Sequence, residues 1–154
     1  MSFNPKQFRE VICCTLADFG EKYSTDAAIE LLMMTAAAES DLGSYLYQDD
    51  GDAEIEQELA LGVFQVESMT FYDVLKRVIQ SRYPGFPCHT FTDLITDIRL
   101  GIVIARFKYW SIPEALPRAD NVRGLARYYK RYYNTPNGKA RTGDVIRKYE
   151  QLCF

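Results

Sequence analysis

The sequence predicts a mainly α-helical single domain, and length, composition and periodicity all support this. The chain has 154 residues, enough to bury a substantial apolar core in one domain. Hydrophobic residues make up 47% of it and charged residues 25%, as is ordinary for a globular protein. Apolar residues recur mostly at helical spacing, with no convincing set of alternating strands. We therefore expect residues 1–154 to form one mainly α domain, with about six helices and at most a small β-ribbon within residues 42–66.

Two helices are predicted near the start of the chain. Residues 5–19 place their apolar side chains on one face, and Gly20 ends the run. The second helix opens with Ser24 or Thr25 as its N-cap and continues through strong helix formers to about Glu39. Its broad apolar stripe is typical of a helix at the centre of a domain.

Four further helices are expected after a long acidic connection. They cover, in order, residues 70–82, 90–110, 121–134 and 142–153. Thr90 and Asp93 are spaced as a capping box for the longest helix, and Asp120 is placed to cap the helix that follows. Within the connection, residues 53–60 are suited to a further short helix.

Charge is distributed unevenly along the chain. The formal net charge of −3 argues against general nucleic-acid binding. Residues 39–58 carry many acidic side chains and no Lys or Arg, whereas residues 118–148 are rich in Lys and Arg. These regions face each other, face a partner or lie in solvent, and solvent is the simplest explanation for most of the charges.

Cysteine and histidine are too few for several common kinds of site. The four cysteines show no metal-ligand spacing and His89 is the only histidine, so we expect no metal site and no cofactor. A nucleophile pair of Cys88 and His89 is a minor alternative. We expect the cysteines to be free and buried, in a protein folded in a reducing compartment.

The N-terminal residues bear on location. The start, MSFNPKQFRE, contains no apolar signal region, and no stretch is long enough to span a membrane. We expect synthesis and folding in a cytoplasm, no membrane insertion, and export, if any, by a route other than a signal peptide.

Three short segments then suggest a family. AAAES ends the second helix at Glu39 and Ser40, LGVFQV follows at 61–66, and YYKRYYNTPNGKA lies at 128–140. In this order they resemble the lysozyme-like lytic transglycosylases of the soluble type, and the third segment is most similar to phage-encoded members. The resemblance spans residues 24–140 and implies a lysozyme-like fold. The third segment departs from the usual Y-N-A-G form, because Thr135 and Pro136 follow the Asn.

The resemblance implies an enzyme that cleaves the β-1,4 bond between N-acetylmuramic acid and N-acetylglucosamine in peptidoglycan. Glu39 would be the single catalytic acid and base, assisted by the N-acetyl group of the substrate, with no cofactor. The implied substrate-binding residues are Ser40, Gly62, Phe64, Gln65, Tyr132, Tyr133 and Asn134. Ser40 would hydrogen-bond near the reacting sugar, although a Ser at a helix end equally suits a local cap.

The second and third segments carry specific expectations. Gly62 would allow the backbone to approach the sugar or Glu39, and Gln65 would orient Glu39 or an N-acetyl group. A turn glycine followed by a short buried strand is an equal alternative for this segment. Tyr132 or Tyr133 would lie beside Glu39, and Asn134 would tie the loop through side-chain hydrogen bonds.

The position of Glu39 suits acid catalysis for a physical reason. An acid that stays protonated near neutral pH needs a pKa raised by partial burial. Glu39 ends an Ala-rich buried helix, where the partial negative charge of the helix C-terminus further disfavours the carboxylate. The alternative is an exposed Glu at the start of the acidic connection.

Other functions stay open at this point. A muramidase-type hydrolase would need a second carboxylate, and the candidates are Asp49, Asp50, Asp52 and Glu67. A structural virion component of tail or capsid would keep the fold with little or no activity, and a helical adaptor with a Tyr-rich interface is a weaker reading. As partners we expect peptidoglycan strands and phage tail or other virion proteins, for a chain that is virion-associated or released to the cell wall.

Overall fold

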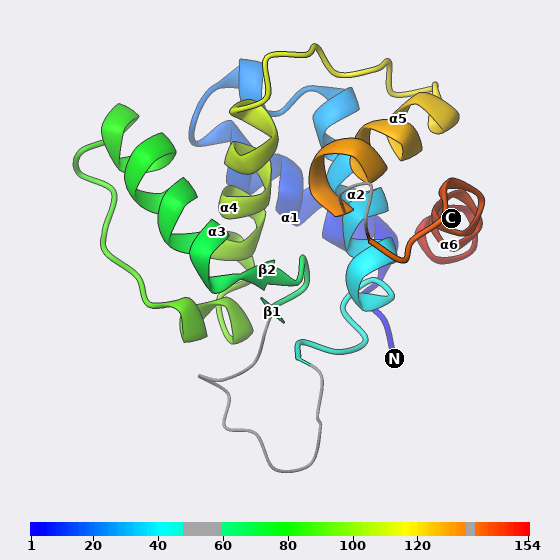
Figure 1. Cartoon of the computed structure of the whole chain (residues 1–154), viewed down its shortest axis with the longest axis horizontal. Helices are drawn as coiled ribbons and strands as arrows, with labels where there is room; N and C mark the ends of the chain where they lie inside the picture. Colours follow the sequence, from blue (N-terminus) through cyan, green and yellow to red (C-terminus); the bar gives the residue numbers. More distant parts are fainter. Residues whose placement is uncertain (48–59, 135–137) are drawn as a thin grey trace.

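In a computed structural model of the chain, the structure describes residues 1–47, 60–134 and 138–154 (Figure 1). In chain order the elements are α1 (Pro5–Ala17), the 3₁₀ helix η1 (Glu21–Tyr23), α2 (Asp26–Ser40), β1 (Ala60–Leu61), β2 (Val66–Glu67), α3 (Ser68–Asp73), the π-helix η3 (Val74–Gln80), the 3₁₀ helix η4 (Phe91–Ile95), α4 (Ile98–Trp110), α5 (Val122–Tyr129), the π-helix η5 (Lys130–Asn134) and α6 (Thr142–Cys153). None of the helices in these ranges is long and apolar enough to cross a membrane.

This architecture confirms the predicted mainly α fold. The strands β1 and β2 form one small antiparallel ribbon, with Ala60 opposite Glu67 and Leu61 opposite Val66. The short helix predicted at 53–60 falls almost entirely outside the described residues, as do Asp49, Asp50 and Asp52.

The helix α2 is the centre of the domain. It packs against α1, α4, α5 and α6, and Figure 1 shows it between them. Its four consecutive side chains Leu31–Met34 are at most 1% exposed, so the middle of the helix is buried around its whole circumference. Thr25 caps its start by accepting a hydrogen bond from the Ala28 amide at 3.3 Å. The predicted central helix, from Thr25 to about Glu39, is therefore confirmed.

The single long helix predicted over 90–110 is wrong. The capping box of Thr90 and Asp93 is present, but it opens only the short 3₁₀ helix η4. The Asp97 side chain then accepts the Leu100 amide at 2.9 Å and starts α4 as a separate helix. With 13 residues, α4 is also shorter than the 15 residues of α2.

The predicted N-cap of α5 is displaced by one residue. Asn121, not Asp120, accepts a hydrogen bond from the Gly124 amide, at 2.9 Å. Asp120 instead forms an ion pair with Arg118, with 2.9 Å between nitrogen and oxygen. The neighbouring cation thus takes the carboxylate, and the adjacent amide side chain caps the helix.

The predicted burial of the cysteines is wrong for three of them. All four are free, but only Cys153 is buried, whereas Cys13, Cys14 and Cys88 are exposed. In α1 the buried side includes Phe8, Ile12, Thr15 and Leu16, so the neighbouring Cys13 and Cys14 face outward.

Candidate functional site

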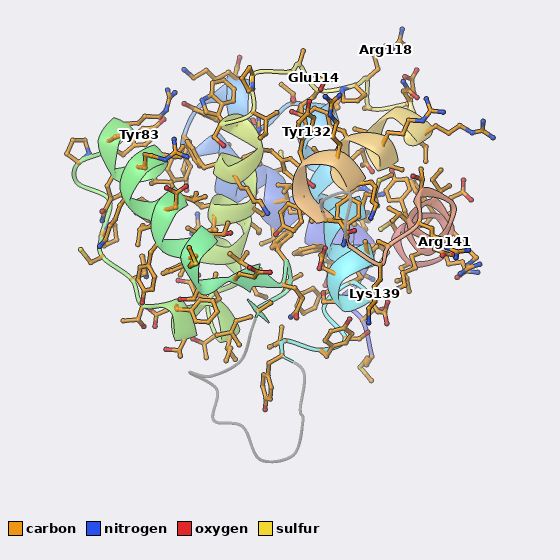
Figure 2. The ribbon with its side chains drawn as sticks, in the orientation of Figure 1. Tyr83, Glu114, Arg118, Tyr132, Lys139 and Arg141 are labelled. Carbon is orange, nitrogen blue, oxygen red and sulfur yellow. The ribbon has the colours of Figure 1, made fainter. Side chains whose placement is uncertain are left out.

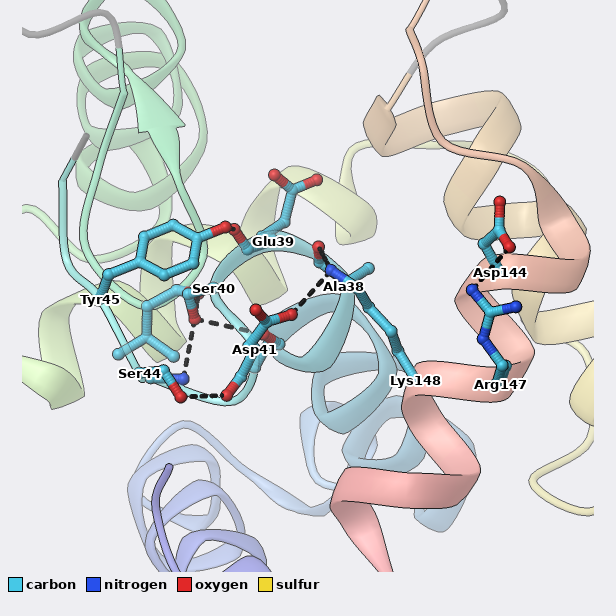
Figure 3. Close-up of polar contacts among 12 residues, drawn as sticks. Ala38, Glu39, Ser40, Asp41, Ser44, Tyr45, Asp144, Arg147 and Lys148 are labelled. Atoms are coloured by element: carbon cyan, nitrogen blue, oxygen red, sulfur yellow. Dashed lines mark hydrogen bonds and ion pairs between the residues drawn. The ribbon is translucent and has the colours of Figure 1, made fainter. Parts of the chain in front are cut away.

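Glu39 lies in the last turn of α2 with its carboxyl group held by an aromatic side chain. Figure 3 shows this carboxyl group directed away from the Ser40 hydroxyl. The side chain is half-buried, and its Oε1 accepts a hydrogen bond from the Tyr129 hydroxyl at 2.5 Å. Tyr129 is 1% exposed and stacks on Tyr133, with ring centroids 5.9 Å apart. The acid is therefore bounded on one side by two packed tyrosines from α5 and η5.

Burial raises the pKa of Glu39, as the sequence argument expects for an acid of this kind. The hydrogen bond from Tyr129 and the positive charges of Lys108 and Lys148 oppose the rise, whereas the negative charge of Glu67 adds to it. The net direction is upward, so a larger share of Glu39 is protonated near neutral pH than for an exposed Glu.

Lys108 belongs to this group of residues, although the sequence analysis did not select it. Its Nζ lies 3.9 Å from the centroid of the Tyr133 ring. Burial lowers the pKa of Lys108, while the charges of Glu39 and Glu67 act against that change. The available signal was a lone Lys in the apolar run GIVIARFKYW, where a buried cation needs a partner.

Glu67 is the one described member of the four candidate second carboxylates. It is exposed at the end of β2, and its charge acts on both Glu39 and Lys108. This places a second carboxylate in the electrostatic neighbourhood of Glu39.

The side chain of Ser40 is buried and fully engaged with the backbone, and its expected hydrogen bond near the reacting sugar stays a prediction. Ser40 is 0% exposed and donates to the Val63 carbonyl at 2.7 Å. It also contacts the Ala36 carbonyl at 3.2 Å and accepts from the Gly43 amide at 2.9 Å. Ser40 thus joins the end of α2 to the turn between β1 and β2, which agrees with the alternative of a local cap.

The turn between the two strands has a structural explanation of its own. Gly62 has φ +81°, and a Cβ there would lie 2.7 Å from the Leu94 carbonyl oxygen. The close approach that Gly62 permits is therefore to η4, and the expected approach to Glu39 or a sugar is not what the structure shows. The Phe64 ring is 1% exposed and packs in the apolar core, and its expected role in substrate binding stays a prediction.

Gln65 also differs from expectation. It has φ +44°, in the left-handed region, and its Nε2 donates to the Gly62 carbonyl at 2.8 Å. Its amide closes its own turn and does not orient Glu39. The alternative of a turn glycine followed by a short strand describes this segment better.

The tyrosines at 128–133 divide between two faces, as their spacing indicates. Tyr129 and Tyr133 share one face, from which Tyr129 donates to Glu39 of α2 and Tyr133 donates to the Phe64 carbonyl between β1 and β2 at 2.6 Å. Tyr132 is directed to the other side, with its hydroxyl bonded to Glu114 (Figure 2). The prediction was that Tyr132 or Tyr133 lies beside Glu39, and of these two Tyr132 is excluded. Tyr133 lies in the group, and Tyr129, which the sequence analysis did not select, makes the contact with the acid.

Asn134 ties its loop as the sequence analysis expects. Its Oδ1 accepts from Lys130 Nζ at 2.9 Å, and the same Nζ donates to the Gly138 carbonyl at 2.7 Å. Lys130 and Asn134 thereby join the two sides of residues 135–137, which lie outside the described residues and include the unusual Thr135 and Pro136.

The acidic and basic regions meet beside the site. Lys148 of α6 forms an ion pair with Asp41, with 2.7 Å between nitrogen and oxygen (Figure 3). Of the three alternatives for these charges, the one in which the two regions face each other describes this contact. Over the described ranges, no group of three or more His, Cys, Asp or Glu residues is arranged to hold a metal ion.

Comparisons with known proteins give no relative for this chain. No family model, no curated protein and no solved structure matches it. The three sequence segments and the geometry around Glu39 are therefore the observations that bear on the function of this chain.

Proposed function

We propose that this protein is a lytic transglycosylase that cleaves peptidoglycan between N-acetylmuramic acid and N-acetylglucosamine. The observation that carries the proposal is the half-buried Glu39, with a raised pKa and a 2.5 Å hydrogen bond from Tyr129. An acid held in this way can both deliver and recover a proton. The order of the three sequence segments supports the same assignment.

In the proposed mechanism Glu39 acts twice. Protonated Glu39 first donates its proton to the glycosidic oxygen as the bond to the anomeric carbon breaks. The N-acetyl carbonyl oxygen of the muramic acid stabilises the developing cation at that carbon. The Glu39 carboxylate then takes the proton of the 6-hydroxyl, whose oxygen bonds to the anomeric carbon and closes a 1,6-anhydro ring. No water is consumed.

Two neighbours fit the intermediate state, in which Glu39 is ionised. Tyr129 already donates to Oε1, and a hydrogen bond to a carboxylate is stronger than one to a neutral acid. The positive charge of Lys108 favours the same ionised form. Both groups therefore assist the step in which Glu39 changes from acid to base.

The proposal extends to context. The likeness of the third segment to phage-encoded enzymes supports a protein that is carried in the virion or released to the wall during lysis. Peptidoglycan strands are then its substrate, and tail or other virion proteins are its partners. Mass spectrometry of purified virions tests this, and a chain found only in the lysate would assign it to lysis.

The test is digestion of purified peptidoglycan by the wild type, Glu39→Gln and Glu30→Gln, with the products identified by mass spectrometry. Glu30 is the matched control, because it also lies on α2 and accepts a tyrosine hydroxyl, from Tyr149. Unlike Glu39, it pairs with Arg9, at 2.7 Å. We expect anhydro-muropeptides from the wild type and Glu30→Gln, and a loss of about 10²-fold or more in Glu39→Gln.

Other outcomes lead to other functions. Circular dichroism first establishes that each variant is folded. Products with reducing ends would indicate a hydrolase, which the influence of Glu67 on Glu39 favours, and Glu67→Gln would then abolish activity. If none of the folded proteins releases products, the structural virion component is favoured. The buried Ser40 and the Gln65 amide, which bonds the Gly62 carbonyl, are compatible with that function.

A further inference from the structure

A cavity of about 640 Å³ lies between the end of α4 and the loop at 111–121. Its volume is in the range of small-molecule sites. Glu39 is not among its lining residues, so the cavity is distinct from the proposed active site. Tyr128 fixes the loop by donating to the Glu114 carbonyl at 2.8 Å, and Tyr132 bonds the Glu114 carboxylate (Figure 2).

Arg106 is the unusual residue of this cavity. It lines the wall, is only 3% exposed, and donates from Nε to the Tyr23 carbonyl at 2.8 Å. Among the described residues, neither Nη group of Arg106 has a hydrogen-bond partner. No Asp or Glu carboxylate of these residues forms an ion pair with Arg106. Burial lowers the pKa of Arg106, which reflects the same lack of compensation. No side-chain nitrogen that is sealed from solvent lacks a partner in the described ranges, so the Nη groups of Arg106 open into the cavity, where an anion can offset the cost of burying the cation.

Further positive charge surrounds the neighbouring Trp110. Lys22 Nζ, Arg82 Cζ and Arg106 Cζ lie 5.5, 5.9 and 5.4 Å from the centroid of its rings. The carboxylate at the rim, that of Glu114, is already occupied by Tyr132 and lies 3.8 Å from Arg131. The cavity therefore favours a negatively charged ligand.

We propose that this cavity binds an organic carboxylate with an apolar body. The carboxylate would accept both hydrogen bonds of the Arg106 Nη groups end-on, since Nε is already used. The apolar body would lie against Ile112, Leu116 and Pro117 of the loop. The cavity offers one pair of Nη donors and apolar walls. It therefore suits an anion with a single charge better than a strongly hydrated phosphate.

The test uses the only tryptophan of the chain, Trp110, as a fluorescent reporter inside the site. The wild type is titrated with 4-phenylbutyrate, its neutral amide and inorganic phosphate. Leu116→Glu and Leu116→Gln then form a matched pair, because Leu116 lines the same cavity as Arg106 and the two variants differ only in the negative charge that they place there. Arg106→Met removes the cation itself, and Arg127→Met, at an exposed position on α5, controls for the change of charge.

We expect a saturable fluorescence change with 4-phenylbutyrate, and binding at least about tenfold weaker for the amide and for phosphate. Leu116→Glu should bind at least about tenfold more weakly than Leu116→Gln, and Arg127→Met should bind as the wild type does. If Arg106→Met fails to fold, the Leu116 pair decides. Equal binding of acid and amide, tighter binding of phosphate, equal affinities for the Leu116 pair, or no saturable change would each overturn the proposal.

Discussion

Replacing Ser40 by Ala tests the assignment of this side chain to structure rather than to substrate. The change removes the hydroxyl that donates to the Val63 carbonyl at 2.7 Å and accepts from the Gly43 amide at 2.9 Å. Val63 is 3% exposed, so water does not replace the lost donor. The Gly43 amide is only partly buried and regains part of its hydrogen bonding from solvent.

The magnitude follows from these two contacts. An unpaired buried carbonyl costs about 1–3 kcal/mol, and the partly buried amide adds about 0.5–1 kcal/mol. We therefore expect Ser40→Ala to lower the free energy of unfolding by about 1.5–4 kcal/mol. For a domain of this size that corresponds to a fall in Tm of roughly 3–16 °C.

Urea denaturation and calorimetry measure this loss, with Ser44→Ala as the matched control. Ser44 is exposed and donates to the Asp41 carbonyl at 2.9 Å in the same turn. Its loss should change stability by less than about 0.5 kcal/mol. Equal stabilities for the two variants would refute the reasoning. Full stability with lost activity in Ser40→Ala would return Ser40 to the substrate site.

Three further predictions concern the site and its turn. The pKa of Glu39 is raised in the folded protein above the value of 4.5 that it has when unfolded, so Glu39 binds a proton more strongly in the folded state. The stability of the wild type therefore falls as pH rises from 4.5 through the raised pKa. Glu39→Gln lacks this loss, so its Tm relative to wild type should increase from pH 4 to pH 7, and a constant difference would contradict the assignment. Tyr129→Phe removes a hydrogen-bond donor that favours the Glu39 carboxylate, so the pKa of Glu39 should rise. The basic limb of the plot of activity against pH should then move to higher pH. A basic limb at the wild-type pH would argue against Glu39 as the acid. Gly62→Ala should cost about 1–3 kcal/mol in urea denaturation, given its positive φ and the Leu94 carbonyl, whereas Gly85→Ala, with open space around its Cβ position, should be nearly neutral.

Local signals account for most of the predicted helices. The start of α2 depends on Thr25 bonding an amide three residues away, and this signal is contained in the sequence around it. The error at 90–110 arose because Thr90 and Asp97 are both good caps within one apolar run. In the structure Thr90 caps η4 and Asp97 caps α4, so the apolar run is divided into two helices. Phe91 and Leu94 of η4 pack in the core.

The sequence by itself determined that a carboxylate, Glu39, ends a buried central helix, and that the tyrosines of 128–133 occupy two helix faces. The tertiary structure alone decided that Tyr129 holds Glu39, that Lys108 lies beside it and that Ser40 is buried. The physical reason is separation along the chain. Helix periodicity and caps depend on residues three or four apart, whereas the contact between Tyr129 and Glu39 joins residues 90 apart. Such a contact depends on how helices pack, and no local pattern records it.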